Sequence, residues 1–290
     1  MGGIIDKITE FIKELLQGWV LINFETMFTD VNDKVGTIAG EVSKTPSTWN
    51  SGIFDMIKTL SDNVMIPIAG MIISFVLVYE LISMVIDKNN LHDFNTAIFI
   101  RFFMKACIAV MLLSKTFDIV MAVFDVGSHI VNSAAAAISG ETSIDVSSTL
   151  QTMFNEQFSE MSIGELLGLG METMIVSLCM KIMSVLITVI LYGRMIEIYL
   201  YVSVAPVPCA TVTNREWGTI GTNYFKGLCA LAFQGFFMMV CVAIYAVLVN
   251  AITVADNLHT AIWSVAAYTV ILCFSLFKTS SLAKSIFNAH

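Results

Sequence analysis

Four ionisable residues stand inside or at the edges of long apolar runs: Glu80, Lys181, Arg194 and Glu197. An ionised group at the centre of a bilayer costs about 2.5–3.5 kcal/mol even on lenient insertion scales, so such groups usually face protein or water. Arg194 and Glu197 are three residues apart, which predicts a pair on one helix face. That pair either anchors a helix end near the headgroups or lines a conduit. Three interpretations apply to Glu80 and Lys181: an interhelical pair, a side chain that snorkels to the membrane interface, or contact with substrate.

Two prolines follow this charged stretch. Pro206 and Pro208 each remove a backbone donor and disrupt the preceding turn. Non-helical backbone at membrane depth persists only where it is buried in protein or lines water, so we predict a bent or re-entrant segment over 195–213. The candidates for lining or gating a passage are the charged and proline residues of these segments: Glu80, Lys181, Arg194, Glu197, Pro206, Pro208 and Arg215.

Other kinds of chemistry have no signal here. The sequence has no GxxxxGK[ST] phosphate loop, no HExxH and no GxSxG, and its four histidines are far apart. The six cysteines form no CxxC pair and lie in apolar segments, which is typical of small hydrophobic packing residues. The sequence therefore predicts no cofactor and no metal, and we do not expect an enzyme. A net charge of −8 disfavours capture of nucleic acid by the whole surface.

The elements that position these residues are membrane helices. The chain has 290 residues, of which 57% are hydrophobic and 13% charged, about half the charged fraction of a typical soluble domain. Its mean hydropathy is +0.80. Apolar runs near 64–86, 171–193, 227–250 and 261–277 reach the length of about 20 residues that spans hydrocarbon. A mixed segment, 95–124, is counted as a further single span.

We therefore predict an all-α, polytopic membrane protein with about five transmembrane helices. Residues 1–63 form an extracytoplasmic region that begins with an amphipathic helix over 1–20. Residues 64–124 hold the first two spans, 125–170 form a central extracytoplasmic loop, and 171–290 form a C-terminal membrane bundle that includes the broken segment.

The distribution of lysine and arginine predicts the orientation. No Lys or Arg occurs between Lys115 and Lys181, so this interval is predicted to lie outside. The basic groups around Lys88, around Arg194 and at the C-terminus are then cytoplasmic. Five spans fit this pattern with the N-terminus outside and the C-terminus inside, provided that 195–213 does not cross completely. The alternative is six spans with the N-terminus inside.

Several unbroken phrases carry a family resemblance. "GRMIEIYLYVSVAPVPCATVTNREWG", "NYFKGLCALAFQGFFMMVCVAIYAVLV" and "LCFSLFKTSSLAKSIFNAH" resemble the TrbL family, the polytopic inner-membrane components of conjugative type IV secretion systems. The similarity is closest to versions carried by Gram-positive conjugative elements. "VGTIAGEVSKTPSTWNSGIFDMI" and "VIDKNNLHDFNTAIF" resemble the same group.

The resemblance implies a function and a location. It implies a multi-pass protein of the bacterial plasma membrane, with the N-terminus outside, that forms part of a conduit for single-stranded DNA with its attached relaxase, and for protein substrates. It implies partner ATPases, which fits the missing phosphate loop, and a homo-oligomer, with a pentamer as the expected number. A membrane scaffold that anchors other secretion subunits and a small-molecule transporter are the competing functions.

The orientation gives a first prediction. A cysteine introduced at Ser147, in the interval without Lys or Arg, should react with a membrane-impermeant thiol reagent added to intact cells. A cysteine at Ser285, near the basic C-terminus, should react only after the cells are opened. Labelling of position 147 from the cytoplasmic side alone would contradict the orientation.

Overall fold

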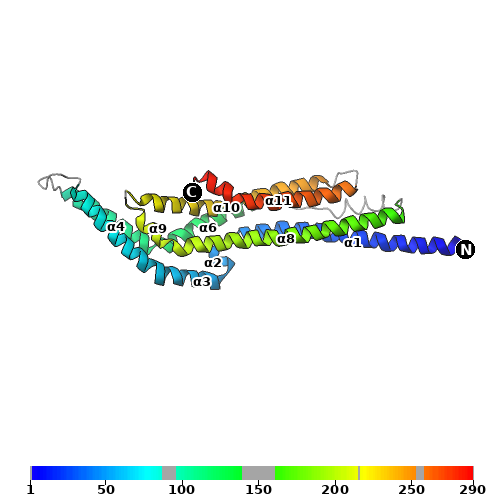
Figure 1. The fold of residues 1–290 in the computed structure, drawn as a ribbon, viewed down its shortest axis with the longest axis horizontal. Helices are drawn as coiled ribbons and strands as arrows, with labels where there is room; N and C mark the ends of the chain where they lie inside the picture. The colour runs from blue at the N-terminus through cyan, green and yellow to red at the C-terminus, as the bar shows by residue number, and fades with distance from the viewer. Residues whose placement is uncertain (1, 87–95, 139–160, 215, 253–257, 290) are drawn as a thin grey trace. The chain divides into compact units, whose positions relative to one another are not determined.

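The computed structural model describes residues 2–86, 96–138, 161–214, 216–252 and 258–289, and within them the regular structure is entirely helical (Figure 1). The prediction of an all-α fold is confirmed. The elements in chain order are α1 (Gly2–Val42), α2 (Pro46–Trp49), α3 (Ser51–Leu60), a π-helical turn η1 (Ser61–Met65), α4 (Ile66–Ile86), α5 (Thr96–Ser114), α6 (Thr116–Ile138), α8 (Ile163–Val204), α9 (Pro206–Thr211), α10 (Gly218–Ile252) and α11 (Leu258–Ile286).

Five stretches of helix are long and apolar enough to cross a membrane: Ser51–Ile86, Thr116–Ile138, Ile163–Val204, Gly218–Ile252 and Leu258–Ile286. The predicted number is confirmed, and the protein is a multi-pass membrane protein.

The single span predicted over 95–124 is wrong, because the helix is interrupted at Lys115 and divides into α5 and α6. The hydroxyls on either side bond back to the preceding turn: Ser114 Oγ donates to Met111 O at 3.0 Å and Thr116 Oγ1 to Leu112 O at 2.8 Å. Such bonds compete with the helix ladder and bend it. The membrane-length helix is α6, which continues into residues predicted to be loop.

Helix α1 is twice as long as the amphipathic helix predicted from the sequence. It continues through the polar residues after position 20, because apolar side chains still recur every three or four residues and are buried. These buried residues are Val20, Phe24, Met27, Val35, Ile38 and Val42. The next helix begins after Thr45, with Pro46 in its first turn, where proline costs no hydrogen bond.

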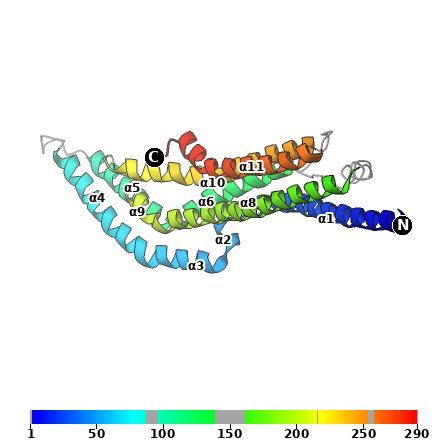
Figure 2. The same ribbon diagram turned by 45° about the vertical axis from the view of Figure 1, so that its right-hand side comes forward.

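The chain divides into two compact units, which are described separately. The first comprises Met1–Val42, Val131–Leu191 and Phe236–Thr279. Its core is shared by α1, α8, α10 and α11, with the end of α6. Helices α1 and α8 lie side by side in both views (Figures 1 and 2).

Contacts of the middle of α1 and the start of α11 with the first turns of α8 tie the first unit together. Trp19 of α1 packs directly on Gly170 of α8. Four residues further along, Asn23 Nδ2 donates to Thr173 Oγ1 at 3.2 Å, so α1 and α8 run in the same direction. His259, at the start of α11, lies 2.6 Å from Glu172 Oε2 of α8.

The second unit comprises Ser43–Ile130, Tyr192–Gly235 and Ser280–His290. The Tyr199 hydroxyl of α8 donates to Pro46 O at 2.7 Å, and the Trp49 ring meets the edge of Tyr192 at 5.2 Å, so α2 is held on α8. Helices α4 and α5 pack against each other, and α9 packs against both (Figure 2).

The contact between Trp19 and Gly170 gives a second prediction. Gly170→Leu should destabilise the protein by about 1–3 kcal/mol, because a larger side chain collides with the indole ring. Trp19→Ala in the same chain should recover part of the loss. The thermal midpoint of the detergent-solubilised protein measures both effects.

Gly168→Leu is the matched control, since a Cβ at Gly168 meets nothing within 4 Å. Equal losses for Gly168→Leu and Gly170→Leu would contradict the packing described here.

Candidate functional site

The bend after α8 is created by the prolines and compensated by neighbouring groups. Pro206 begins α9, where its missing N–H breaks no bond inside that helix. It does end α8, because Val202 O loses its donor. The N–H of Ala205 turns to Val202 O at 3.3 Å, and the carbonyl of Tyr201 instead accepts from the Tyr224 hydroxyl at 2.9 Å. The bend therefore starts at Ala205, ten residues later than the sequence predicts.

Helix α9 is packed tightly on two sides. Ala210 is fully buried together with Ala69 and Ile73 of α4 and with Ala109 and Leu113 of α5. The three alanines at this contact are small enough for helices to approach closely in a membrane.

The start of α10 also approaches α9. A Cβ on Gly221 would lie 2.7 Å from Pro208 O, so only glycine fits there. The two prolines are thus enclosed by neighbouring helices of the second unit.

A polar cluster joins the turn after α9 to α4 and α5, and we define it as the α4–α9 cluster by its members: Tyr79, Glu80, Lys105, Asn214, Glu216 and Trp217. At its centre, Glu80 Oε1 pairs with Lys105 Nζ at 2.6 Å and Glu80 Oε2 accepts from Asn214 Nδ2 at 3.3 Å. The Glu80 side chain is 14% exposed. Both oxygens of this largely buried carboxylate have partners, as a charge at membrane depth requires.

Asn214 also shapes the turn itself. Its Oδ1 accepts from the backbone N–H of Glu216 at 2.8 Å and of Trp217 at 2.9 Å, while its carbonyl accepts from the N–H of Gly218. This is the bonding of a helix N-cap, a position that favours asparagine. One side chain therefore starts the helical turn that leads into α10 and donates to Glu80.

An aromatic stack closes the α4–α9 cluster. Trp217 stacks between Phe75 and Tyr79 of α4, with ring centroids 5.5 and 5.7 Å away. The Tyr79 hydroxyl donates to Glu216 Oε2 at 2.8 Å. Arg215, a candidate from the sequence, follows Asn214 in the chain and lies outside the residues that the structure describes.

The predicted pair of Arg194 and Glu197 is wrong. Glu197 Oε1 instead accepts from Lys284 Nζ of α11 at 2.8 Å. The two residues of α8 are about 60° apart around the helix, and Arg194 turns into the core while Glu197 lies at the edge facing α11. A neighbouring helix thus supplies the cation.

Arg194 is buried, with 7% of its surface exposed. Its Nε has no hydrogen-bond partner among the described residues. Since arginine keeps its charge in proteins, this guanidinium marks a place where the described part of a single chain does not satisfy a buried cation.

Lys181 lies in the first unit, apart from the other candidates. It is exposed on α8, and no ion pair joins it to a described residue. Ser177, Ser184 and Thr188 recur with it at helical spacing, and all four side chains are at least partly exposed. We call these four residues the α8 polar strip.

The α8 polar strip crosses an otherwise apolar surface. Leu178 and Val185, beside it, are 60% and 63% exposed, as expected for side chains that face lipid. The strip needs different surroundings, because a lysine facing hydrocarbon costs about 2.5–3.5 kcal/mol.

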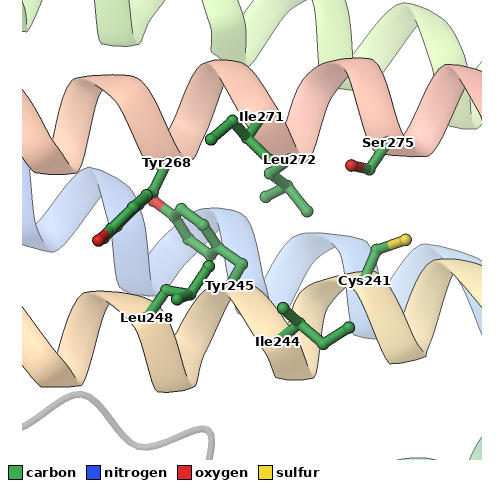
Figure 3. Close-up of a pocket in the computed structure, with 8 residues that line it drawn as sticks. All are labelled: Cys241, Ile244, Tyr245, Leu248, Tyr268, Ile271, Leu272 and Ser275. Atoms are coloured by element: carbon green, nitrogen blue, oxygen red, sulfur yellow. The ribbon is translucent and has the colours of Figure 1, made fainter.

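A groove lies between α10 and α11 in the first unit (Figure 3). It holds about 60 Å³ and is lined mainly by apolar side chains, with Tyr245 and Tyr268 at one end. The Tyr245 hydroxyl is bonded to Thr269 Oγ1 at 2.9 Å. A water takes about 30 Å³, so this groove is far too small to pass a macromolecule.

Sequence reasoning missed three partners. Lys105 and Lys284 carry no signal that could be read from the sequence, because nothing local reveals which acid a distant lysine will meet. Asn214 carried a readable signal, since asparagine before "REWG" and an apolar run is typical of a helix start.

The arrangement defines the class of the protein as a multi-pass α-helical membrane protein with paired charges at its helix contacts. A family model described as "TrbL/VirB6 plasmid conjugal transfer like protein" matches residues 31–206, more than half of the chain. The chain therefore belongs to the TrbL/VirB6-like conjugal transfer family, which confirms the resemblance. It is a membrane component of a conjugal transfer system and acts with other subunits of that system. The chain matches no curated protein and no solved structure.

The cap at Asn214 gives a third prediction. Asn214→Ala should weaken the turn by about 1–2 kcal/mol, because it removes two bonds to backbone N–H groups. Faster hydrogen–deuterium exchange at residues 216–220 of the purified protein would show it.

Asn223→Ala, at an exposed position in α10, is the control and should leave this exchange unchanged. Slow exchange in Asn214→Ala would mean that the side chain does not hold the turn.

Proposed function

We propose that this protein forms part of the channel wall of a conjugative type IV secretion system. The cargo is single-stranded DNA with its attached relaxase, together with protein substrates. Separate ATPase subunits supply the energy. Family membership supports a role in conjugal transfer, and the α8 polar strip is the observation that supports a position in the channel wall.

The α8 polar strip supports a wall because of where it lies. A lysine and three hydroxyls follow one line through the apolar part of a membrane-length helix, with lipid-type side chains beside them. The Thr188 hydroxyl already donates to Ser184 O at 3.0 Å. Water or polar cargo on that line can bond to the Lys181 ammonium and the two serine hydroxyls, whereas lipid offers them no partner.

One chain does not close a passage around this strip, because the strip is on the outer surface of α8. We propose that several copies form a ring, and a ring of five follows from the family resemblance. The N-terminus is outside and the C-terminus cytoplasmic in this arrangement.

The α4–α9 cluster suits a gate or a firm support at the cytoplasmic mouth. Its bonds fix the proline-containing α9 against α4 and α5, and Arg215 is the next residue in the sequence after Asn214. Glu80, Pro206, Pro208 and Arg215 thus stay candidates for gating, and Arg194 and Glu197 border the same bend.

Replacement of the lysine gives a fourth prediction. Lys181→Leu should lower the frequency of DNA transfer about tenfold, which corresponds to about 1.4 kcal/mol in the barrier to passage. Membrane insertion should be normal or improved, since leucine suits lipid better. Mating frequency and the amount of protein in the membrane are the two measurements.

Lys278→Leu, which removes another exposed lysine from a membrane helix of the same unit, is the matched control and should transfer normally. Crosslinking of transferring DNA to a cysteine at position 181 tests contact directly. Normal transfer by Lys181→Leu together with no crosslink would favour a scaffold, and substrate flux by the purified protein alone would favour a transporter.

A further inference from the structure

Helix α1 has two faces of opposite character after residue 20. One face is buried in the core of the first unit and is apolar, as described above. The opposite face is exposed and, apart from Ile22, its described side chains are polar or small. We call it the α1 polar face and define it by its residues: Glu25, Thr26, Thr29, Asp33, Gly36, Thr37 and Gly40.

Nothing in the described chain covers this face. Each of its residues is exposed, and a Cβ built on Gly36 meets no atom within 4 Å. Among soluble proteins such a face would simply meet solvent. That explanation is insufficient here, because α1 packs beside an apolar helix of membrane length.

That neighbour is the apolar helix α8. Asn23 bonds to Thr173 across a register of 150 residues, and the two helices run in the same direction. The same register sets 171–191, within the apolar run of α8, beside 21–41 of α1. Both views show the two helices side by side (Figures 1 and 2). The α1 polar face therefore lies at the depth of a membrane span.

Lipid does not suit this face. Glu25 and Asp33 are exposed carboxylates, and Asp30 is half-exposed at its edge. Carboxylates at membrane depth face protein or water. The exposed residues of α8 at the same depth outside its polar strip are mainly apolar, Leu178, Ile182 and Val185 among them, so lipid has a surface of its own in this unit.

The α1 polar face of a second chain would also bind poorly to this face. The face and its edge carry three acids, Glu25, Asp30 and Asp33, against one cation, Lys34. Two such faces would bring like charges together in a medium of low dielectric, which opposes association.

We infer that the α1 polar face lines a water-filled part of the passage, so that α1 crosses the membrane beside α8. With the N-terminus outside and the C-terminus cytoplasmic the number of crossings is odd, so one of the five apolar stretches then does not cross completely. This inference rests on the proposed function. It places in the channel wall a segment that the sequence analysis predicts to lie outside the membrane. Residues 20–42 are then within the membrane rather than in the extracytoplasmic region.

The orientation of the chain agrees with this placement. Because α1 runs in the same direction as α8, its N-terminus is on the side where α8 begins, which is the predicted exterior. Lys44, which directly follows α1, is then on the cytoplasmic side, as the positive-inside rule favours.

A cysteine scan tests the inference, and it is our fifth prediction. Single cysteines at Glu25, Thr29, Asp33 and Thr37, in a chain with Cys107→Ala, should react with a membrane-impermeant maleimide in cells that assemble the whole secretion system. Cysteines at the buried Phe24, Met27 and Ile38 should not react. Leu178→Cys, on the lipid-facing surface of α8, should also stay unlabelled.

Transfer is measured before and after labelling. A bulky maleimide on Thr29→Cys should block transfer, whereas the same treatment of Leu178→Cys should not. Labelling of Thr29→Cys without any effect on transfer would overturn the inference, because water would reach the face without the passage running there.

Two further outcomes would also overturn it. Absence of labelling at all four positions would mean that lipid or protein covers the face, and disulfide formation between copies at position 29 or 33 would identify that cover as a second chain. In either case a transfer defect in Lys181→Leu would still stand, so the proposed function and this inference fail separately.

Discussion

Every backbone carbonyl at membrane depth needs a donor, and this constraint governs how the chain can bend. Pro206 takes a donor away from α8, and without compensation the bend would leave buried carbonyls unpaired. The Tyr224 hydroxyl bonds to Tyr201 O, and Ala205 N–H bonds to Val202 O. With these bonds made, α9 can pack against α4 and α5, and the α4–α9 cluster can form beside it.

The carboxylates of Glu80 and Glu197 obey the same rule, and each is matched by a lysine from another helix. Glu80 meets Lys105 from α5, and Glu197 meets Lys284 from α11. Each pair therefore joins segments that are far apart in the sequence and makes a helix contact specific. Arg194 and Lys181 have no such partner among the described residues, which is why they direct attention to what lies outside a single chain.

The fold class and the apolar spans could be predicted from composition and run length, because both depend on the chain alone. The length of α1 could not, since Glu25 and Asp33 gave its second half the appearance of a loop, although buried Phe24 and Ile38 kept the helical period. The prolines revealed the bend but not its start, because a proline disturbs only the preceding turn. The partner of Glu197 stands 87 residues away, and no local pattern identifies it.

Fixed carboxylates along a helix at membrane depth have an electrical consequence. A wet wall that carries Glu25 and Asp33 would concentrate small cations and repel anions, in the manner of acidic rings in cation channels. An idle passage of this kind would leak ions and run down the membrane potential of the host cell. The assembled ring therefore has to seal tightly between mating events and to open a path during mating.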